Sequence, residues 1–430
     1  MEKLSTQPYK GTRDFYPEEM ILRNWFFGKI KSVLKNYTYE EYNGPMLEPL
    51  ELYAAKSGQE IVNEQTYNFI DRGGRSLAVR PEMTPTVARM VAGKLGELSM
   101  PLRWFSIPNL YRYEKPQRGR LREHWQINVD LFGCDTVEAD LEIINIAISL
   151  LKSFGANENM FKVKINNRKF FNDIFKNVLK LNNENSIKAS KAIDRKNKVP
   201  REVYFEDLKI LGLSDENIQL IDNLFEMPVL EAIKVCEDSE GAKELKGLFE
   251  MINKMNLNNY CEFDFSVIRG LDYYTGTVFE VFDESPENRR AMFGGGRYDN
   301  LIGLFSNNAS VSGIGFGFGD VTLENFLTIH NLIPDIISKN EKILITRFDD
   351  VEYTEYVKLA EEIRNQGINV SIFLGNKKFG KQIEYALKER YTHIIVMGSS
   401  EIEDNEFVIK DLIKREERKI KREEKINLNI

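Results

Sequence analysis

Residues 124–131 read HWQINVDL, and polar and apolar side chains alternate strictly along them. Alternation with a period of two is typical of a β-strand that has one face in the core. The polar face lacks the Thr, Lys and Glu that a solvated sheet usually carries. It carries instead His124, Gln126, Asn128 and Asp130. The stretch therefore predicts a half-buried sheet and raises the question of what its polar face binds.

A cationic loop precedes this strand. Its five cations lie close together in the chain: Arg112, Lys115, Arg118, Arg120 and Arg122. Guanidinium groups match phosphate bidentately, so a loop of them suits a polyphosphate. A solvated basic hairpin is the alternative, although Pro116 and Gly119 stiffen and turn the loop between two strands that we expect to be buried. If the first strand continues to Glu114, Arg112 and Glu114 share one of its faces.

The segment RPEMT, residues 80–84, carries a second set of candidate binding residues. It places Glu82 and Thr84 between a strand and a helix, where a carboxylate and a hydroxyl suit the ammonium group of an amino acid. There are two alternatives: Thr84 caps the helix, and Glu82 pairs with Arg80.

The segment IRGLDYY presents Arg269 and the adjacent Tyr273 and Tyr274, which enter a strand. Adjacent residues of a strand face opposite ways, so one tyrosine packs in the core and the other lines whatever lies across the sheet. Gly270 beside the Arg allows a backbone bend and the close approach of a ligand. Ordinary sheet packing with a surface Arg is the alternative.

Three glycine-containing segments invite interpretation as nucleotide loops. FGGGRYDNL and GIGFGFGD place their glycines on predicted strands, unlike the G-x-G-x-x-G turn that opens a helix. We expect these glycines to let an adenine or a neighbouring backbone approach the sheet. GNKKFGKQ, residues 375–382, has the spacing of a phosphate-binding loop, but Gln382 stands where the magnesium-binding hydroxyl belongs. A phosphate-loop NTPase would rest on this segment alone.

The remaining pattern predicts an α+β chain. Its first part should contain a helix from Pro17 to about Tyr37, a hairpin around Gly73 and Gly74 that ends at Pro81, a helix beginning near Thr84, and a helix from Asp140 to Phe154. Residues 171–255 have helical spacing and little strand signal, which predicts a helical insertion. After Pro334 the pattern becomes βαβαβ, the rhythm of a small parallel sheet. The charged tail IKREERKIKREEK is expected to be a solvated helix.

Composition limits the class of protein. The 430-residue chain carries a net charge of −7, which argues against blanket nucleic-acid binding but allows local phosphate-binding patches. No run of about 18 apolar residues and no apolar signal segment occurs, so we expect a cytoplasmic protein without membrane contact. Cys134, Cys236 and Cys261 lack C-x-x-C spacing, so we expect reduced thiols and no zinc site.

Taken together, these segments resemble the histidyl-tRNA synthetases, a family of class II aminoacyl-tRNA synthetases. The likeness runs through YKGTRDFYPEE, the first class II motif GPMLEPLELY, RPEMT, the second motif at 103–133, RGLDYYTGTVFE and GGGRYDNL. It implies a class II antiparallel sheet core flanked by helices, with a helical insertion and a C-terminal α/β domain. The implied domains are a split catalytic core at 1–170 and 256–333, the insertion at 171–255, and an anticodon-binding-like domain with its charged tail at 341–430.

The resemblance also implies an activity: ATP-dependent activation of L-histidine and its transfer to tRNA(His) by a homodimer. Mg²⁺ would be bound with the ATP, without a dedicated metal site. The residues implied at the α-amino group of histidine are Glu82, Thr84 and Gln126, and those implied at its imidazole are Asp130 and Tyr274. Tyr273 is also implied in histidine binding. Those implied at ATP are Arg112 for the α-phosphate, Arg120 for the terminal phosphates and Glu114. Arg269 would hold the carboxylate and the α-phosphate, and the implied catalytic residues are Arg112, Gln126 and Arg269.

One departure from the family leaves an alternative open. The third class II motif normally offers an Arg in a G-x-E-R context, and GIGFGFGDVTLENFL contains none. Arg120 or another cation would then have to serve the terminal phosphate. The missing Arg favours a non-charging relative, the histidine-binding regulatory subunit of ATP phosphoribosyltransferase. The intact RGLDYY and the separate C-terminal domain favour the synthetase.

Overall fold

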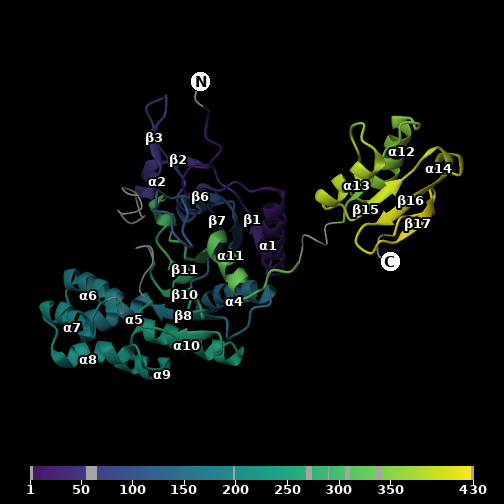
Figure 1. Ribbon diagram of the computed structural model, residues 1–430. Helices are drawn as coiled ribbons and strands as arrows, with labels where there is room; N and C mark the ends of the chain where they lie inside the picture. Colours follow the sequence, from purple (N-terminus) through teal and green to yellow (C-terminus); the bar gives the residue numbers. More distant parts are fainter. Residues whose placement is uncertain are drawn as a thin grey trace. The chain divides into compact units, whose positions relative to one another are not determined.

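The computed structural model describes residues 3–54, 65–196, 199–267, 274–288, 290–305, 310–335 and 341–427. The chain forms two compact units, Met1–Ile333 and Pro334–Ile430 (Figure 1). Each unit has its own hydrophobic core. No helix in the described residues is long and apolar enough to cross a membrane.

A large, mostly antiparallel sheet organises the first unit. In the described residues its strands run in the order β1 (Glu40–Glu41), β5 (Leu102–Ser106), β7 (Glu123–Phe132), β12 (Gly313–Gly319), β11 (Ala291–Tyr298), β10 (Thr277–Asp283), β8 (Phe161–Asn167) and β9 (Cys261–Phe263), and β6 (Asn109–Tyr111) also pairs with β7. The pairs β1 with β5 and β8 with β9, at the two edges, are parallel. The alternating stretch of the sequence is β7, as predicted, and it lies in the middle of the sheet.

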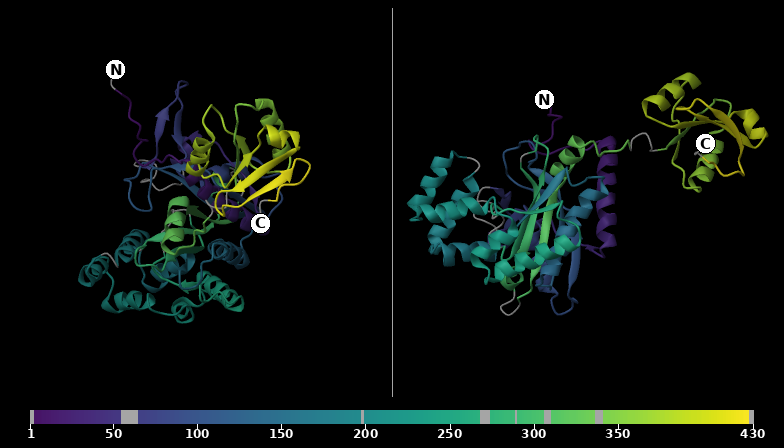
Figure 2. Two further views of the ribbon diagram at one scale, coloured as in Figure 1. Left: turned by 45° about the vertical axis from the view of Figure 1, so that its right-hand side comes forward. Right: turned by 90° about the horizontal axis from the view of Figure 1, so that it is seen from below.

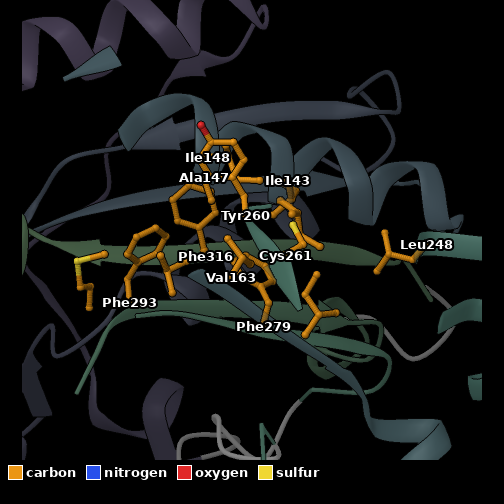
Figure 3. Close-up of a cluster of buried hydrophobic side chains, with 14 of the residues drawn as sticks. Ile143, Ala147, Ile148, Val163, Leu248, Tyr260, Cys261, Phe279, Phe293 and Phe316 are labelled. Atoms are coloured by element: carbon orange, nitrogen blue, oxygen red, sulfur yellow. The ribbon is translucent and has the colours of Figure 1, made fainter. Parts of the chain in front are cut away.

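Helices cover one face of this sheet. They include α1 (Pro17–Asn36), α4 (Val137–Ser153), α10 (Glu240–Lys254) and α11 (Asp320–Ile329). Figure 3 shows the core beneath them, where Ile143 and Ala147 of α4 meet Phe279 and Phe316 of the strands. The apolar face of β7 belongs to the same core. Because side chains alternate along a strand, the polar residues of β7 lie on the opposite face, away from these helices.

A three-stranded sheet with the order β2 (Leu47–Pro49), β4 (Ser76–Val79) and β3 (Asn68–Ile70) lies in the same unit. The turn between β3 and β4 contains Gly74 in the left-handed region, with a φ of +78°, so the predicted hairpin is confirmed. The helices near it are α2 (Leu50–Ala54), α3 (Thr84–Gly93) and the 3₁₀ helix η5 (Ile302–Leu304). The predicted start of a helix at Thr84 is confirmed as well.

Residues 168–254 are largely helical, as their spacing predicted. The elements are α5 (Arg168–Asp173), the π-helix η2 (Ile174–Val178), α6 (Asn183–Arg195), α7 (Arg201–Ile210), α8 (Asp215–Leu224), α9 (Val229–Ala232), the 3₁₀ helix η4 (Ile233–Cys236) and α10. Side chains of Asn182, Ser214 and Ser239 accept backbone N–H bonds at the starts of α6, α8 and α10. α10 packs against β8 and α4, and α5 packs against β8. Figure 2 shows the teal helices of this segment gathered together in the first unit.

The second unit has a five-stranded sheet in the order β14 (Val370–Ile372), β13 (Ile343–Ile345), β15 (His393–Val396), β16 (Glu406–Asp411) and β17 (Glu417–Lys421). β13 is parallel to β14 and to β15, and the helices α12 (Tyr353–Arg364) and α13 (Phe379–Lys388) connect them, which confirms the βαβαβ prediction. The short helix α14 (Ser399–Glu403) precedes β16.

The prediction of a solvated helix for the charged tail was wrong. β17 lies within that tail and pairs with β16 as an antiparallel hairpin. Ile420 is buried in the core with Phe407 and Ile409, while Lys419 and Lys421 both reach Glu406, at 2.6 and 3.0 Å. A buried isoleucine and cross-strand ion pairs stabilise a hairpin that the high charge content of the tail concealed.

Candidate functional site

A cavity of about 1180 Å³ opens on the polar face of β7. It is lined by His124 and Gln126 of β7, by the loop between β6 and β7, by the turn between β10 and β11, and by the start of α11. The alternating strand β7 therefore borders a large cavity.

Glycines of the neighbouring strand keep this face open. Gly315 and Gly317 of β12 pair with Asp130 and Asn128 of β7. A Cβ added to Gly315 would lie 2.5 Å from Oδ1 of Asp130, and one added to Gly317 would lie 2.7 Å from Nε2 of Gln126. The glycine-rich segment is thus part of a strand, as expected, and its missing side chains leave room for Asp130 and Gln126 of the neighbouring strand.

The cationic loop forms one wall of the cavity. β6 ends at Tyr111, so Arg112 and Glu114 follow the strand rather than extending it. The loop tip closes through two backbone hydrogen bonds between Gln117 and Arg120, and Nη1 of Arg120 lies 3.3 Å from Oε2 of Glu114. Gly119 adopts a φ of +78°, which confirms its predicted role in turning the loop.

The RPEMT segment lies against this loop. Nε of Arg112 donates to the carbonyl oxygen of Pro81 at 2.9 Å, which joins two motifs that are far apart in the sequence. Glu82 is buried, and Thr84 is the first residue of α3 while Met83 is its N-cap, so Thr84 is not the cap. The guanidinium of Arg80 donates to backbone carbonyls of Gly44 and Asn109, at 2.7 and 3.0 Å.

Asp130 is a buried carboxylate whose two oxygens differ. The hydroxyl of Tyr298 donates to Oδ1, whereas Oδ2 is buried without a hydrogen-bond partner in the described part of the chain. Burial raises the pKa of Asp130 to about 7, although the hydrogen bond from Tyr298 opposes this rise. Asp130 lies on the same face of β7 as Gln126, which lines the cavity, although Asp130 itself is not among the lining residues. An unpaired buried carboxylate oxygen is well suited to accept an N–H from a bound molecule.

Sequence reasoning missed Tyr298 as a site residue. It lies on β11 opposite Gly313 of β12, on the same face as Asp130. Tyr274 packs in the cluster that contains Tyr298, and it lies beside Gly296, where an added Cβ would come within 3.0 Å of its ring. Arg269 and Tyr273, which the sequence also nominated, lie outside the described residues.

His124 borders the cavity two residues before Gln126. Burial and the nearby charge of Arg112 lower the pKa of His124 to about 3. Its ring is therefore neutral at physiological pH, and it presents an uncharged aromatic surface rather than a further cation.

The segment at the position of the third class II motif, GIGFGFGDVTLENFL, provides a buried structural carboxylate and no cation. Asp320, the first residue of α11, is fully buried and accepts from Arg13 at 2.8 Å, from Arg23 at 2.7 Å and from the backbone nitrogen of Trp125 at 2.9 Å. This network fixes the start of α11 to β7. The next residues of the helix, Val321 and Thr322, line the cavity, so no arginine reaches it from this segment.

The GNKKFGKQ segment has a structural role in the second unit. Gln382 is buried at the start of α13, where its amide accepts from the backbone nitrogen of Arg347 and donates to the carbonyls of Arg347 and Lys377, each at 2.8 Å. This side chain holds the loop to a neighbouring segment, and it offers no hydroxyl to a metal ion.

Carboxylates are scattered around the large cavity rather than clustered. No group of three or more His, Cys, Asp or Glu side chains suited to a metal ion occurs among the described residues. A Mg²⁺ ion that enters with phosphates needs only one or two protein carboxylates, and Glu114 and Glu280 line the cavity.

Comparisons with known proteins agree with this architecture. A family model described as Histidyl-tRNA synthetase matches residues 11–320, and one described as Anticodon binding domain matches residues 336–428. A protein named Histidine--tRNA ligase from Leptospira biflexa serovar Patoc is 49% identical over 417 residues, which cover 96% of this chain and 95% of the relative.

Solved structures show the same fold. The histidyl-tRNA synthetase from Nostoc sp. PCC 7120 superposes with a TM-score of 0.80 at 21% identity, and 97% of each chain is covered. A structure titled as an ATP phosphoribosyltransferase regulatory subunit/histidyl-tRNA synthetase from Bacillus halodurans C gives a TM-score of 0.76 at 25% identity, covering 92% of this chain and 99% of the other.

The mostly antiparallel sheet, its open polar face and the cationic loop above it define a class II aminoacyl-tRNA synthetase fold. Within that class, the matched family model covers most of the chain and the relatives are similar along nearly its whole length. The chain belongs to the histidyl-tRNA synthetase family.

Proposed function

We propose that the chain activates L-histidine with ATP in the cavity above β7 and then transfers the histidyl group to tRNA(His). The observation that carries this proposal is the pair of features on one sheet face: a buried carboxylate with an unpaired oxygen, and a loop of arginines beside the cavity. The first suits an imidazole N–H and the second suits phosphates.

The amino acid would lie along the polar face of β7. Its α-amino group would meet Glu82, Thr84 and Gln126, and its imidazole would donate to Oδ2 of Asp130. Tyr273 and Tyr274 would complete this pocket. Support comes from the burial of Glu82 and Asp130 and from the contact of Arg112 with Pro81, which brings the phosphate-binding loop beside the RPEMT segment.

The reaction needs orientation and positive charge rather than a protein nucleophile. A carboxylate oxygen of histidine attacks the α-phosphorus of ATP, the bond to the bridging oxygen breaks, and the electron pair leaves with pyrophosphate. Arg112 and Arg269 would stabilise the charge on the α-phosphate, Gln126 would orient the attacking amino acid, and Arg120 with Glu114 would hold the terminal phosphates. Glu114 and Glu280, which line the cavity, are carboxylates that would contact a Mg²⁺ ion bound with the phosphates, and the ion would neutralise phosphate charge.

We also propose that residues 336–428 bind the anticodon region of the tRNA, because an anticodon-binding family model matches them. The catalytic core would comprise 1–170 and 256–333, with 171–255 as an inserted helical domain. The same match argues against the non-charging regulatory subunit, for which a tRNA-binding domain would have no use. The free state of the described cysteines is in keeping with a cytoplasmic location.

A homodimer would cover an apolar surface near the first class II motif. Large hydrophobic side chains lie exposed there and on neighbouring segments of the same unit: Met46, Leu47, Phe69, Ile70, Leu304 and Phe305. Apolar surface of this kind marks protein interfaces more often than solvated surface. A monomeric mass at micromolar concentration would contradict the dimer.

Histidine-dependent exchange of pyrophosphate into ATP tests the central proposal. The purified chain with Mg²⁺ should catalyse exchange with L-histidine and with no other amino acid. Histidine binding without exchange would favour the regulatory subunit instead.

A further inference from the structure

Among the described residues, four arginine side chains line the cavity: Arg112, Arg118, Arg120 and Arg290. The first three belong to the loop between β6 and β7, and each has a partner. Arg112 donates to a backbone carbonyl, Arg120 lies beside Glu114, and Nη2 of Arg118 lies 3.3 Å from Oε2 of a glutamate. Arg290 comes from a different segment, the turn between β10 and β11. Its exposed side chain forms neither a hydrogen bond nor an ion pair in the described structure.

The turn that carries Arg290 is anchored at its base. The carboxylate of Asp283, whose side chain is fully buried, accepts from the backbone nitrogen of Ser285 at 2.8 Å and from the side-chain amide of Asn288 at 3.0 Å. Nε2 of His330, at the end of α11, lies 2.8 Å from the same carboxylate. A turn held in this way presents its side chains with little reorganisation when a ligand binds.

The ion pair between Arg118 and Glu287 shows where this turn lies. It joins the tip of the cationic loop to the turn, three positions before Arg290. Arg112, in contrast, is held at the base of the loop, beside Pro81. Arg290 therefore belongs with the loop tip, where the far end of a nucleotide would lie, rather than with the amino-acid end of the cavity.

We propose that Arg290 binds the terminal phosphates of the nucleoside triphosphate and supplies, from the turn between β10 and β11, the cation that the start of α11 lacks. The inference rests on the proposed function of the cavity. When the bond to the bridging oxygen breaks, negative charge collects on the departing pyrophosphate, and an arginine at that position stabilises it. Arg290 is thus a phosphate-binding residue of the activation step rather than a tRNA-binding one.

The variant Arg290→Ala tests this assignment in the full-length chain, with Arg290→Lys as the conservative variant. Pyrophosphate exchange should show a rise of the KM for ATP, or a fall of kcat, of about tenfold or more, the usual effect of losing a charged hydrogen bond. The KM for histidine should stay within about twofold, and Arg290→Lys should recover part of the loss. Arg72→Ala is a matched control, because Arg72 is also exposed but lies in the hairpin turn away from the cavity lining.

Equilibrium binding of ATP and of AMP separates phosphate binding from a structural effect. Arg290→Ala should weaken ATP binding about tenfold and leave AMP binding unchanged, because AMP lacks the terminal phosphates. Equal weakening of both nucleotides, or normal exchange combined with poor tRNA charging, would overturn the assignment. If the unmodified chain shows no pyrophosphate exchange, the proposed function fails. If the unmodified chain shows exchange and Arg290→Ala shows the same exchange, only the inference about Arg290 fails.

Discussion

Replacing Asp130 with Asn should make the ligand-free protein more stable at alkaline pH. Burial raises the pKa of this carboxyl from 3.8 to about 7, so above pH 7 the folded chain holds a poorly compensated charge that the unfolded chain exposes to water. Each unit by which the folded-state pKa exceeds the unfolded-state pKa lowers the free energy of unfolding by about 1.4 kcal/mol once the carboxyl is ionised. A rise from 3.8 to about 7 therefore lowers it by about 4 kcal/mol at most at pH 8. The amide leaves an unpaired N–H₂ in place of Oδ2, which costs about 1–3 kcal/mol. Asp130→Asn should therefore gain about 1–3 kcal/mol at pH 8.

The gain should disappear in acid. Between pH 4 and pH 7 the folded state retains a proton that the unfolded state loses, so the stability of the unmodified chain falls as the pH rises through this window. The stability of Asp130→Asn should not fall with pH in this window, because the amide does not ionise. At pH 5 the carboxyl of the folded chain is largely neutral, and the variant should be no more stable than the unmodified chain.

Asp140→Asn is a control with the opposite sign. Asp140 is also buried, but it accepts from Nε of Arg297 at 2.9 Å and from Thr277 at 2.6 Å. Burial also raises the pKa of Asp140, to about 6, but the charge of Arg297 opposes this rise, so the penalty that Asp140→Asn relieves is smaller than at Asp130. The substitution also breaks a buried ion pair and leaves Arg297 with the carboxylate of Asp299 at 3.9 Å, and breaking such a pair costs about 3–5 kcal/mol. At pH 8, Asp130→Asn should thus stabilise the fold and Asp140→Asn should destabilise it.

Urea unfolding followed by tryptophan fluorescence is the suitable assay. The three tryptophans of the chain, at positions 25, 104 and 125, all lie in the first unit, so the signal reports the unit that contains Asp130. If Asp130→Asn is less stable than the unmodified chain at pH 8 while Asp140→Asn behaves as expected, the carboxylate is compensated by something else and the argument fails.

Three further outcomes are expected. Gly317→Ala should fold but raise the KM for histidine in pyrophosphate exchange by about tenfold, because the new Cβ displaces the amide of Gln126; an equal rise of the KM for ATP would contradict this. Gly241→Ala should lower the free energy of unfolding by about 1–3 kcal/mol or more in urea titrations, because its Cβ would overlap the backbone of Phe170; unchanged stability would show that α10 can shift. A chain that ends at Pro334 should retain exchange and lose tRNA charging, since the two units have separate cores; loss of both activities would make the second unit part of the catalytic core.

Local sequence patterns were sufficient to predict those elements whose structure depends mainly on their own residues. The alternation in β7, the Pro17 start of α1 and the glycine turn between β3 and β4 each predicted the observed element, because the relevant forces act within a few residues. The charged tail failed for a physical reason: a solvated helix and an edge hairpin both expose their charges, and only the burial of Ile420 distinguishes them.

Long-range partners could not be read from the sequence. Tyr298 donates to Asp130 across 168 positions, and the contact depends on the register of β11, β12 and β7. The bonds of Asp320 to Arg13 and Arg23 span even more of the chain. A single sequence shows which residues are polar, but strand order decides which of them meet.

The unpaired oxygen of Asp130 links the stability of the empty protein to the selectivity of the proposed site. A neutral side chain would fit this position without placing a charge in the core, so the carboxylate is favourable only if a ligand compensates it. An imidazole N–H that donates to Oδ2 would stabilise the ionised form and lower its pKa, so histidine binding between pH 6 and pH 7 should release a proton. An amino acid without such an N–H leaves the carboxylate uncompensated, and a site built on a buried polar partner rejects such a ligand by roughly 10⁴-fold or more.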